Sequence, residues 1–419
     1  FAITIAGDEP GLPYDRVGLT DHLAGLRAAA DLPLHNTRWY RERGIALTGA
    51  IADARDGVAT TASGDRIAYD ALVLATGSRP FLPPIEGIER AIAFRSRHDV
   101  RTIRGRTHGA RRAVVIGGGL LGLEAARAVA NRGIAVTVVH LAGQLMERQL
   151  DPTAGRMLER ALREQGIDVA CDCMTAAIHE DRVELSTGET IEADLVIVAA
   201  GVTPETTLAR RMGVQVDRGV LVDDSLRTNI PGVWAVGECA EHRGLLVGLA
   251  APAKAMARAA AADIAGSPAA YVPSRAATRL KVAGIELYCS GELEGDDEVV
   301  VLDTRAGHYR REVYRDDELV GTIVLGDPPR AHGDAPADPL ICACNGVTRS
   351  TILASGAADL EGVRRATRAA TGCGGCAPAV RALLDEAAEV GFQAVQLEPA
   401  KAIEVLVRRP VEVGRAGRQ

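Results

Sequence analysis

An apolar run, a glycine-rich turn and a helical pattern succeed one another within residues 112–140, and this order restricts the chain to few folds. Gly117, Gly119 and Gly122 form a G-x-G-x-x-G pattern between the first apolar run and the helical segment, and a second apolar run follows. Strand, helix and strand are thus completed in about thirty residues. In such units the first glycine makes a tight turn, the second admits a pyrophosphate and the third lets the helix pack on the strand. The pattern predicts a dinucleotide site on a parallel sheet.

The second strand of this unit ends at His140, where an acid that binds an adenosine ribose is expected. Arg148 follows further along the chain, either as a solvated surface charge or as a partner for a 2′-phosphate. We therefore predict NAD(P)H binding and leave the choice between NADH and NADPH open.

Three further apolar runs end in turns that contain glycine, at residues 71–80, 195–204 and 228–238. Ligands of doubly wound sheets bind at the carboxyl ends of the strands. We therefore expect the following turn residues to lie at such an edge: Thr76, Gly77, Gly201, Gly237 and Glu238.

Four cysteines near the carboxyl end form two close pairs, Cys342 with Cys344 and Cys373 with Cys376. Pairs at such tight spacing in glycine-rich sequence are typical of four thiolates that converge on one metal centre. In a reducing compartment, such thiols are more often metal ligands than disulfides. The pattern predicts an iron–sulfur cluster, with tetrahedral zinc as the alternative.

The remaining cysteines form neither a C-x-x-C nor a C-x4-C dithiol, and we expect small buried hydrophobic side chains at these positions: Cys171, Cys173, Cys239 and Cys289.

The composition is that of an ordinary globular protein, with 419 residues, 47% of them hydrophobic, and a net charge of −7. A negative chain without a basic block argues against nucleic acid or an anionic membrane surface as partner. No uninterrupted apolar run approaches the roughly 20 residues of a membrane span. These features predict a cytoplasmic protein.

Periodicity and linker composition divide the chain into several domains. Residues 251–265 are alanine-rich and helical in pattern, alternating apolar runs predict an antiparallel sheet from residue 278 to 327, and proline and glycine mark a linker before the cysteines. The predicted division is 1–110 and 226–272 for the two parts of an FAD domain, 111–225 for an inserted NAD(P) domain, 273–330 for a small β-rich domain, 331–339 for the linker, 340–395 for a helical [2Fe-2S] domain and 396–419 for a tail.

Together these motifs resemble the pyridine-nucleotide flavoprotein reductases, which carry an FAD domain with an NAD(P) domain inserted in it. Segments 13–17, 138–140, 145–151 and 341–347 are more narrowly similar to the amino-terminal half of the large subunit of NAD(P)H nitrite reductases. They are also similar to the electron-transfer subunit of assimilatory nitrate reductases. The cysteine segment resembles the ferredoxin module of the bacterioferritin-associated ferredoxin (BFD) type, which binds a [2Fe-2S] cluster. The resemblance implies an α/β fold with two Rossmann-like domains, a small antiparallel domain and a small helical domain.

The resemblance also assigns roles to individual residues. It implies that Gly237 and Glu238 meet the ribityl and phosphate part of FAD and that Thr76 and Gly77 lie along it. Arg16 would lie on the flavin side of the pocket, and Glu9 would bind the adenosine ribose, with Asp8 as second candidate. Glu124 would lie close to the nicotinamide, since the first turn of a helix accepts an acid well.

The implied reaction transfers a hydride from NAD(P)H to FAD. Single electrons then pass from FAD to the cluster and from the cluster to a partner reductase. No acid–base triad is needed. The favoured partner is the catalytic unit of a nitrite or nitrate reductase, containing siroheme or molybdenum, and homo-oligomer formation is left open. The alternatives are an FAD and [2Fe-2S] subunit of an amine, opine or glycine dehydrogenase, and a non-catalytic zinc-bound redox sensor.

The resemblance carries two expectations about the ends of the chain. The first glycine-rich unit of the FAD domain belongs upstream of Phe1, and the siroheme half of the nitrite enzymes belongs downstream of Gln419. We therefore expect weakened FAD binding in the chain as given, and nitrite reduction on another unit.

Overall fold

The computed structural model describes residues 1–267, 270–273, 277–282, 285–326, 340–342, 345–371 and 374–394. The predicted linker at 331–339, the tail at 396–419, Cys344 and Cys373 lie outside the described residues.

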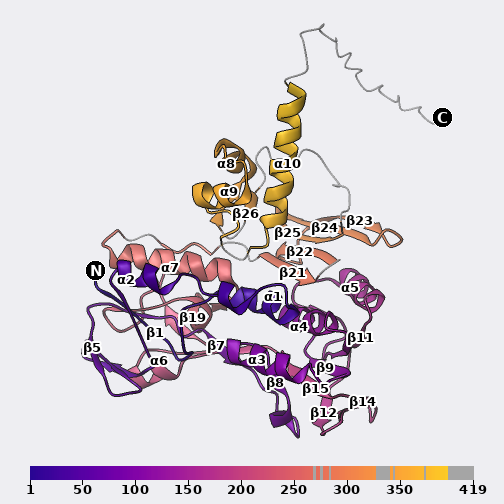
Figure 1. Cartoon of the computed structure of the whole chain (residues 1–419), viewed down its shortest axis with the longest axis horizontal. Coiled ribbons are helices and arrows are strands. Elements are labelled where there is room, and N and C mark those ends of the chain that lie inside the picture. Colours follow the sequence, from indigo (N-terminus) through magenta and orange to yellow (C-terminus); the bar gives the residue numbers. More distant parts are fainter. Residues whose placement is uncertain are drawn as a thin grey trace, which may run out of the picture.

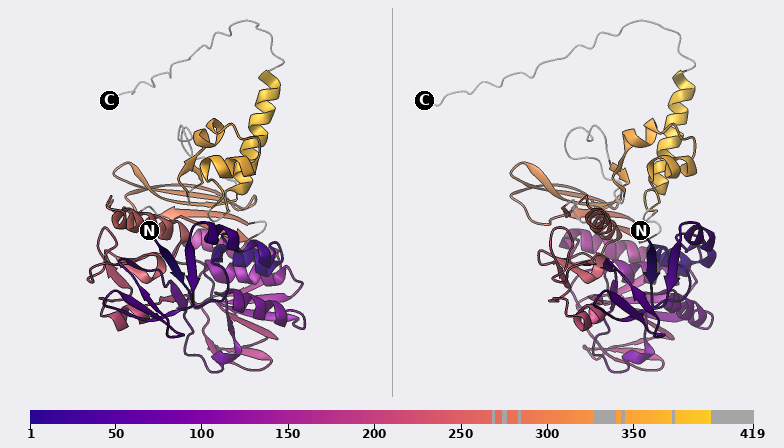
Figure 2. Two further views of the ribbon diagram at one scale, coloured as in Figure 1. Left: turned by 60° about the vertical axis from the view of Figure 1, so that its left-hand side comes forward. Right: turned by 90° about the vertical axis from the view of Figure 1, so that its left-hand side faces the viewer.

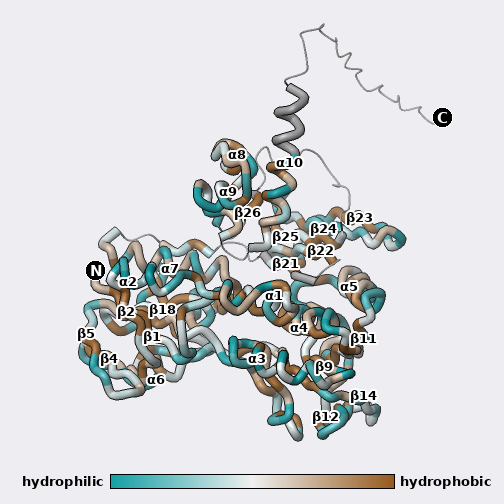
Figure 3. Tube along the Cα trace, in the orientation of Figure 1, coloured by the Kyte–Doolittle hydropathy of each residue, from teal (hydrophilic) through white to brown (hydrophobic). Residues whose placement is uncertain are grey.

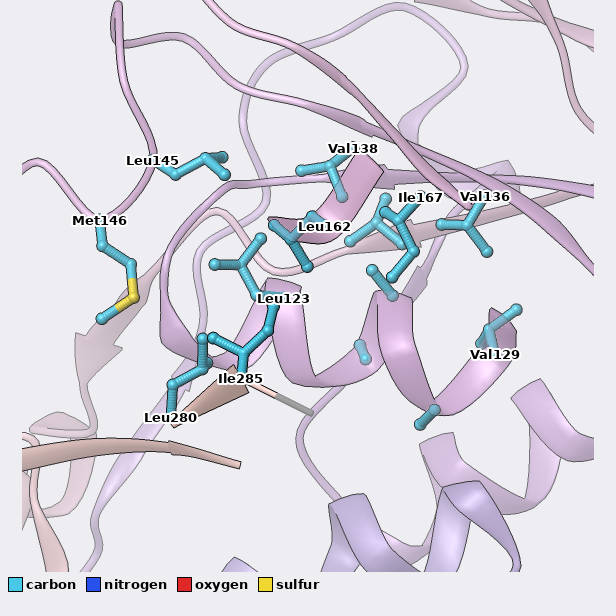
Figure 4. Packing of buried hydrophobic residues seen from close by; sticks show 14 of the residues in the cluster. Leu123, Val129, Val136, Val138, Leu145, Met146, Leu162, Ile167, Leu280 and Ile285 are labelled. Carbon is cyan, nitrogen blue, oxygen red and sulfur yellow. The ribbon is translucent and has the colours of Figure 1, made fainter. Parts of the chain in front are cut away.

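A five-stranded parallel sheet in the order β11-β10-β9-β15-β8 forms the predicted dinucleotide unit. Its strands are rich in valine and isoleucine and buried on both faces, as expected when helices or further strands cover a parallel sheet. The bounds are β8 Ile92–Ala93, β9 Arg112–Ile116, α4 Leu120–Ala130, β10 Ala135–Val139, α5 Pro152–Glu164, β11 Ile167–Ala170 and β15 Leu195–Val198. Figure 4 shows Leu123 of α4 among side chains from several of these elements.

A smaller antiparallel sheet covers the face of the parallel sheet that lies opposite α4. It consists of β12 Thr175–Ile178, β13 Arg182–Leu185 and β14 Thr190–Glu192. Its apolar residues share a core with β9 and β15, so the unit has a hydrophobic cluster on each side of the sheet.

The segments before and after this unit come together beside it, which confirms that it is inserted in a second α/β domain (Figure 1). Strand β6, Leu72–Leu74, pairs in parallel with β18, Val233–Ala235, and β1, Ile3–Ala6, pairs in parallel with β2, Ile45–Thr48. These two pairs are separate sheets, and all four residues of β1 are exposed. Other elements here are α1 Leu19–Ala24, α2 Thr37–Glu42, β3 Ile51–Arg55, β4 Val58–Thr61, β5 Arg66–Ala68, β7 Ser78–Pro80, α3 Arg97–Arg106, β16 Val202–Pro204, α6 Thr207–Met212, β17 Val220–Val222, β19 Ala240–His242, β20 Leu245–Leu246 and α7 Ala250–Ile264.

The predicted antiparallel sheet is present and packs on the dinucleotide unit. Its order is β21-β22-β25-β24-β23, with Leu280 and Ile285 in the same core as Leu123. The Tyr309 hydroxyl donates a 2.6 Å hydrogen bond to Asp151, which caps the start of α5. The strands are β21 Ala277–Val282, β22 Ile285–Gly291, β23 Asp297–Asp303, β24 His308–Arg315 and β25 Glu318–Leu325.

The C-terminal module has a small core of its own, to which Cys342 and Cys376 belong. It lies over α7 and the antiparallel sheet (Figure 2). Its elements are β26 Leu340–Cys342, β27 Val347–Thr348, α8 Arg349–Ala354, α9 Leu360–Thr367 and α10 Ala377–Ala394.

Hydrophobic residues follow the strands and α4 (Figure 3). In the part of the chain that the structure describes, no helix combines the length and the apolar character needed to cross a bilayer.

Candidate functional site

The glycine turn between β9 and α4 leaves space at one glycine and none at two others. Gly117 has a φ of 121°, and a Cβ there would lie 2.4 Å from the Ala199 carbonyl oxygen. A Cβ on Gly122 would lie 2.0 Å from the Gly117 carbonyl oxygen, so the helix packs directly on the turn. A Cβ on Gly119 would meet nothing within 4 Å. This open side, together with the N–H groups of the first turn of α4, fits a pyrophosphate.

Glu124 is buried at the contact between α4 and α1. Its side chain accepts a 2.8 Å hydrogen bond from the Thr20 hydroxyl. The expectation that Glu124 lies in the first turn of the helix is wrong, because α4 begins at Leu120 and its first turn contains no acid. The Glu124 carboxyl is held by Thr20 of α1, a residue that the sequence did not single out.

His140 lies against the glycine turn at the end of β10. Its Nδ1 accepts a 3.1 Å hydrogen bond from the Gly118 N–H, and its Nε2 lies 3.0 Å from an oxygen of Glu147. Since Nδ1 is the acceptor, Nε2 carries the proton in neutral imidazole and donates to Glu147.

Gly201, Thr76 and Gly77 lie in the two connections between the halves of the molecule. Gly201 has a φ of 114°, and its carbonyl accepts from the Phe81 N–H at 2.9 Å. The Thr76 hydroxyl donates to the Glu205 carbonyl oxygen at 2.5 Å, and the Glu205 N–H donates to the Gly77 carbonyl at 2.9 Å. Strands β7 and β16 pair antiparallel across this region. Thr76 and Gly77 therefore lie beside Glu205 at one end of this strand pair, and Gly201 lies beside Phe81 at the other end.

Glu238 accepts hydrogen bonds from Ser78 and Arg95. The Ser78 hydroxyl lies 2.8 Å from its carboxylate, and the Arg95 guanidinium forms an ion pair with the same oxygen. Gly237 precedes it with a φ of 79°, and its N–H lies 3.4 Å from the Met256 sulfur on α7. The Gly237–Glu238 turn is thus seated on α7.

Glu9 and Arg16, which the sequence assigned to opposite ends of the FAD, contact each other at 2.6 Å. The Tyr14 hydroxyl donates to the same carboxylate at 2.8 Å. Burial acts to raise the pKa of Glu9, but the hydrogen bonds from Arg16 and Tyr14 and the Arg16 charge outweigh it, so the pKa is lowered. Burial raises the pKa of Tyr14 to about 12. The carboxylate is ionised and the phenol protonated at neutral pH.

Arg95 connects these two groups, and sequence reasoning missed it. Its carbonyl accepts from Arg16 at 2.7 Å while its guanidinium pairs with Glu238. Its buried Nε atom has no hydrogen-bond partner among the described residues. An unsatisfied buried N–H beside this edge fits an acceptor group of a bound dinucleotide such as FAD. Because Arg95 follows β8, the rule that ligands bind beyond strand ends would have found it.

Cys342 and Cys376 are brought together in the C-terminal module. The two side chains are hydrogen-bonded, the Ala370 N–H lies 3.2 Å from the Cys376 sulfur, and the Asn345 amide lies 3.8 Å from the Cys342 sulfur. The contact with Cys376, followed by the N–H donors, lowers the pKa of Cys342 to about 5 against the effect of burial. N–H groups directed at sulfur favour thiolates, which fits ligation of a cluster. The partners Cys344 and Cys373 lie outside the described residues.

The other cysteines have a different environment. Cys239 and Cys289 are buried, and Cys171 and Cys173 are half-buried. Burial raises the pKa of Cys171 and of Cys289 to about 11. The thiols of Cys171 and Cys289 therefore remain protonated at neutral pH.

Residues 1–263 match the family model described as pyridine nucleotide-disulphide oxidoreductase. The chain belongs to this family. Residues 277–332 match the rubredoxin NAD+ reductase C-terminal domain, and residues 340–386 match the BFD-like [2Fe-2S] binding domain.

Curated relatives include the nitrite reductase [NAD(P)H] and the assimilatory nitrate reductase electron transfer subunit of Bacillus subtilis. The first is 37% identical over 94% of this chain and 55% of its own length, and the second is 34% identical over 92% and 56%. The nitric oxide reductase FlRd-NAD(+) reductase of Aeromonas salmonicida is 33% identical over 77% of this chain and 84% of its own length. The chain thus spans about half the length of the first two relatives.

Among solved structures, a ferredoxin reductase from Rhodopseudomonas palustris is similar, with a TM-score of 0.73, 26% identity and coverage of 77% of this chain and 84% of its own. These findings confirm the predicted family, the fold class and the assignment as an NAD(P)H-dependent flavoprotein oxidoreductase. They also confirm the predicted cofactors, FAD, NAD(P)H and a [2Fe-2S] cluster.

Substitutions at Gly122 and Gly119 separate packing from binding. Gly122→Ala forces a methyl group against backbone and is expected to destabilise the chain by about 1–3 kcal/mol, as overpacking does. Gly119→Ala keeps the fold but fills the open space and weakens binding of NAD+. Thermal unfolding and calorimetric titration with NAD+ measure both effects, and Gly119→Ala with unaltered affinity would show that the pyrophosphate lies elsewhere.

The lowered pKa of Glu9 predicts a pH-dependent contribution to stability. The charged form is favoured in the folded state, so the contribution is complete above the usual value of 4.5 and is lost as the pH falls through the lower folded value. Glu9→Gln should lower the midpoint of thermal unfolding at pH 7, and the difference from the parent should shrink as the pH falls below 4.5 and vanish once the pH lies below the lower folded pKa. The exposed Glu180→Gln serves as control, and a difference for Glu9→Gln that persists in acid contradicts the prediction.

Proposed function

We propose that this chain is the electron-input part of a nitrite or nitrate reductase, taking electrons from NAD(P)H and delivering them through its iron–sulfur module to the catalytic unit. When bound, FAD accepts a hydride and the [2Fe-2S] cluster carries single electrons. Gly117, Gly119 and Gly122 would hold the pyridine nucleotide, the Glu9, Arg16, Arg95 and Glu238 network would hold FAD, and Cys342, Cys344, Cys373 and Cys376 would hold the cluster. The predicted domain boundaries are retained in this proposal.

One observation carries the proposal: the cysteine module and the FAD residues are both in contact with α7. At one end of α7, Ala253 lies 3.6 Å from the position of a Gly237 Cβ. Further along, Arg258 lies 3.4 Å from the side-chain oxygen of Asn345, whose amide faces the Cys342 sulfur. Ala253 and Arg258 are separated by about 7.5 Å along the helix axis.

This short separation supports direct passage of electrons between the two groups without a dithiol relay. Outside the cysteine module, the sequence contains neither the C-x-x-C nor the C-x4-C dithiol of disulfide reductases. The protein's own contribution is therefore to hold the nicotinamide next to the flavin, and the flavin next to the thiolates.

The two Bacillus subtilis relatives support nitrite or nitrate reduction as the destination of the electrons. We propose a catalytic unit that contains siroheme or molybdenum as the acceptor, on the same polypeptide or on a separate one. The proposal is tested by adding NADH anaerobically to the loaded chain together with such a unit and nitrite or nitrate. Flavin bleaching followed by loss of the oxyanion is expected. Bleaching by amino acids or amines instead of NADH would favour the amine, opine or glycine dehydrogenase alternative.

Cys376→Ser should remove the cluster, because one of four thiolate ligands is lost. The parent is expected to contain about two irons and two acid-labile sulfides per chain, and the variant almost none. Cys289→Ser is the matched control, since this buried thiol contacts the Thr278 carbonyl and should leave the iron content unchanged. One zinc per parent chain and no labile sulfide would establish the zinc-bound alternative.

Arg258→Ala should slow electron passage to the cluster while leaving reduction of the flavin by NADH unchanged. Loss of a contact of about 0.5–1.4 kcal/mol predicts a roughly twofold to tenfold decrease in the rate of cluster reduction. Stopped-flow absorbance separates the two steps, and the exposed Arg101→Ala on α3 serves as control. Equal slowing of both steps would contradict the role given to the α7 contact.

A further inference from the structure

The end of β10 lacks the acid by which dinucleotide units of this kind commonly bind the adenosine ribose. His140 occupies the position, and its side chain is 11% exposed. Its Nδ1 is already used by the Gly118 N–H. The imidazole is thus turned toward the glycine turn, and another group is needed to bind the ribose hydroxyls.

The segment after β10 returns to the same glycine turn and places a carboxylate there. The Met146 N–H donates to the Gly118 carbonyl at 3.1 Å, and Leu145 packs within 2.6 Å of the position of a Gly118 Cβ. Met146 is 1% exposed and has a φ of 51°, a conformation that a non-glycine residue keeps only where its surroundings determine it. The backbone on which Glu147 is mounted is therefore held firmly to the turn.

The side chain of Glu147 is held by His140. The imidazole Nε2–H donates to one carboxylate oxygen at 3.0 Å, and the side chain of Glu147 remains 41% exposed. Within the described part of the chain, the other oxygen of Glu147 has no hydrogen-bond partner. Two hydrogen bonds, from Gly118 to His140 and from His140 to Glu147, thus present a negative, solvent-facing acceptor beside the turn that would hold the pyrophosphate.

We propose that Glu147 is the ribose-binding acid of this chain, that His140 is its positioning residue, and that the pair makes the chain selective for NADH over NADPH. The inference rests on the proposed function. A ribose 2′-hydroxyl can donate to the free carboxylate oxygen. A 2′-phosphate offers only acceptors and carries nearly two negative charges, so Glu147 repels it.

Arg148 is the competing residue, because a guanidinium would attract a 2′-phosphate. It is exposed and adjoins Glu147 in sequence. The structure favours Glu147, since its carboxylate is fixed by a hydrogen bond to the glycine-turn unit, whereas no such contact of the Arg148 side chain is seen among the described residues.

The test is calorimetric titration of the full chain with NAD+ and with NADP+, which requires no electron transfer. The parent should bind NAD+ at least about tenfold more tightly than NADP+, the ratio that one hydrogen bond to a charged group supplies. Glu147→Gln should reduce the ratio of NAD+ affinity to NADP+ affinity to about one. The variant should bind NADP+ more tightly and NAD+ more weakly than the parent. Arg148→Ala is the matched neighbouring control and should leave the ratio at its parent value.

His140→Ala tests positioning, and His140→Gln tests its rescue. The alanine variant should lose most of the preference for NAD+, while the amide of glutamine can donate to Glu147 and should restore a substantial part of it. A merely structural role of His140 predicts equal loss of affinity for both nucleotides in both variants.

Several results overturn the inference. These are equal or tighter binding of NADP+ by the parent, an unchanged ratio in Glu147→Gln, or a selective loss of NADP+ binding in Arg148→Ala. If the parent binds neither nucleotide, the proposed function falls with the inference. If it binds both equally well, only the inference falls.

Discussion

The close approach of the Gly122 α-carbon to the Gly117 carbonyl oxygen determines where the rest of the dinucleotide unit lies. With no side chain on either residue, α4 begins directly on the end of β9. Helix α4 then brings Glu124 to Thr20 of α1 and Leu123 to the core shared with the antiparallel sheet. One backbone contact therefore sets the position of the nucleotide turn relative to both neighbouring domains.

Charge pairing organises the FAD side of the site. Burying a charge is costly unless it is paired and hydrogen-bonded, and here each carboxylate has a guanidinium partner: Glu9 has Arg16, and Glu238 has Arg95. The bond from Arg16 to the Arg95 carbonyl joins the two pairs. The network is thus held together by contacts between the protein's own groups.

Much of the fold follows from local patterns, whereas several site contacts do not. The β9–α4–β10 unit, helix α7 and the antiparallel sheet were each predicted from periodicity and turn residues, because the hydrophobic period directly reflects the buried face. Arg95 and Thr20 were missed because their partners, Glu238 and Glu124, lie more than a hundred residues away. The sequence pattern predicted Glu124 in the first helical turn. Because α4 begins at Leu120, Glu124 lies beyond that turn.

The sequence by itself determined the chemistry that is available: three glycines at a strand–helix junction, four cysteines in two pairs, and no dithiol of the disulfide-reductase type among the other cysteines. These depend on residue type and short spacing, which a linear pattern records. Only the tertiary structure decided which groups meet. It brought Glu9 to Arg16, turned His140 toward Gly118 and Glu147, and brought Asn345 of the cysteine module to Arg258 of α7. Such contacts depend on how the chain turns back on itself and on how its elements pack, and packing is a property of the whole core rather than of any one segment.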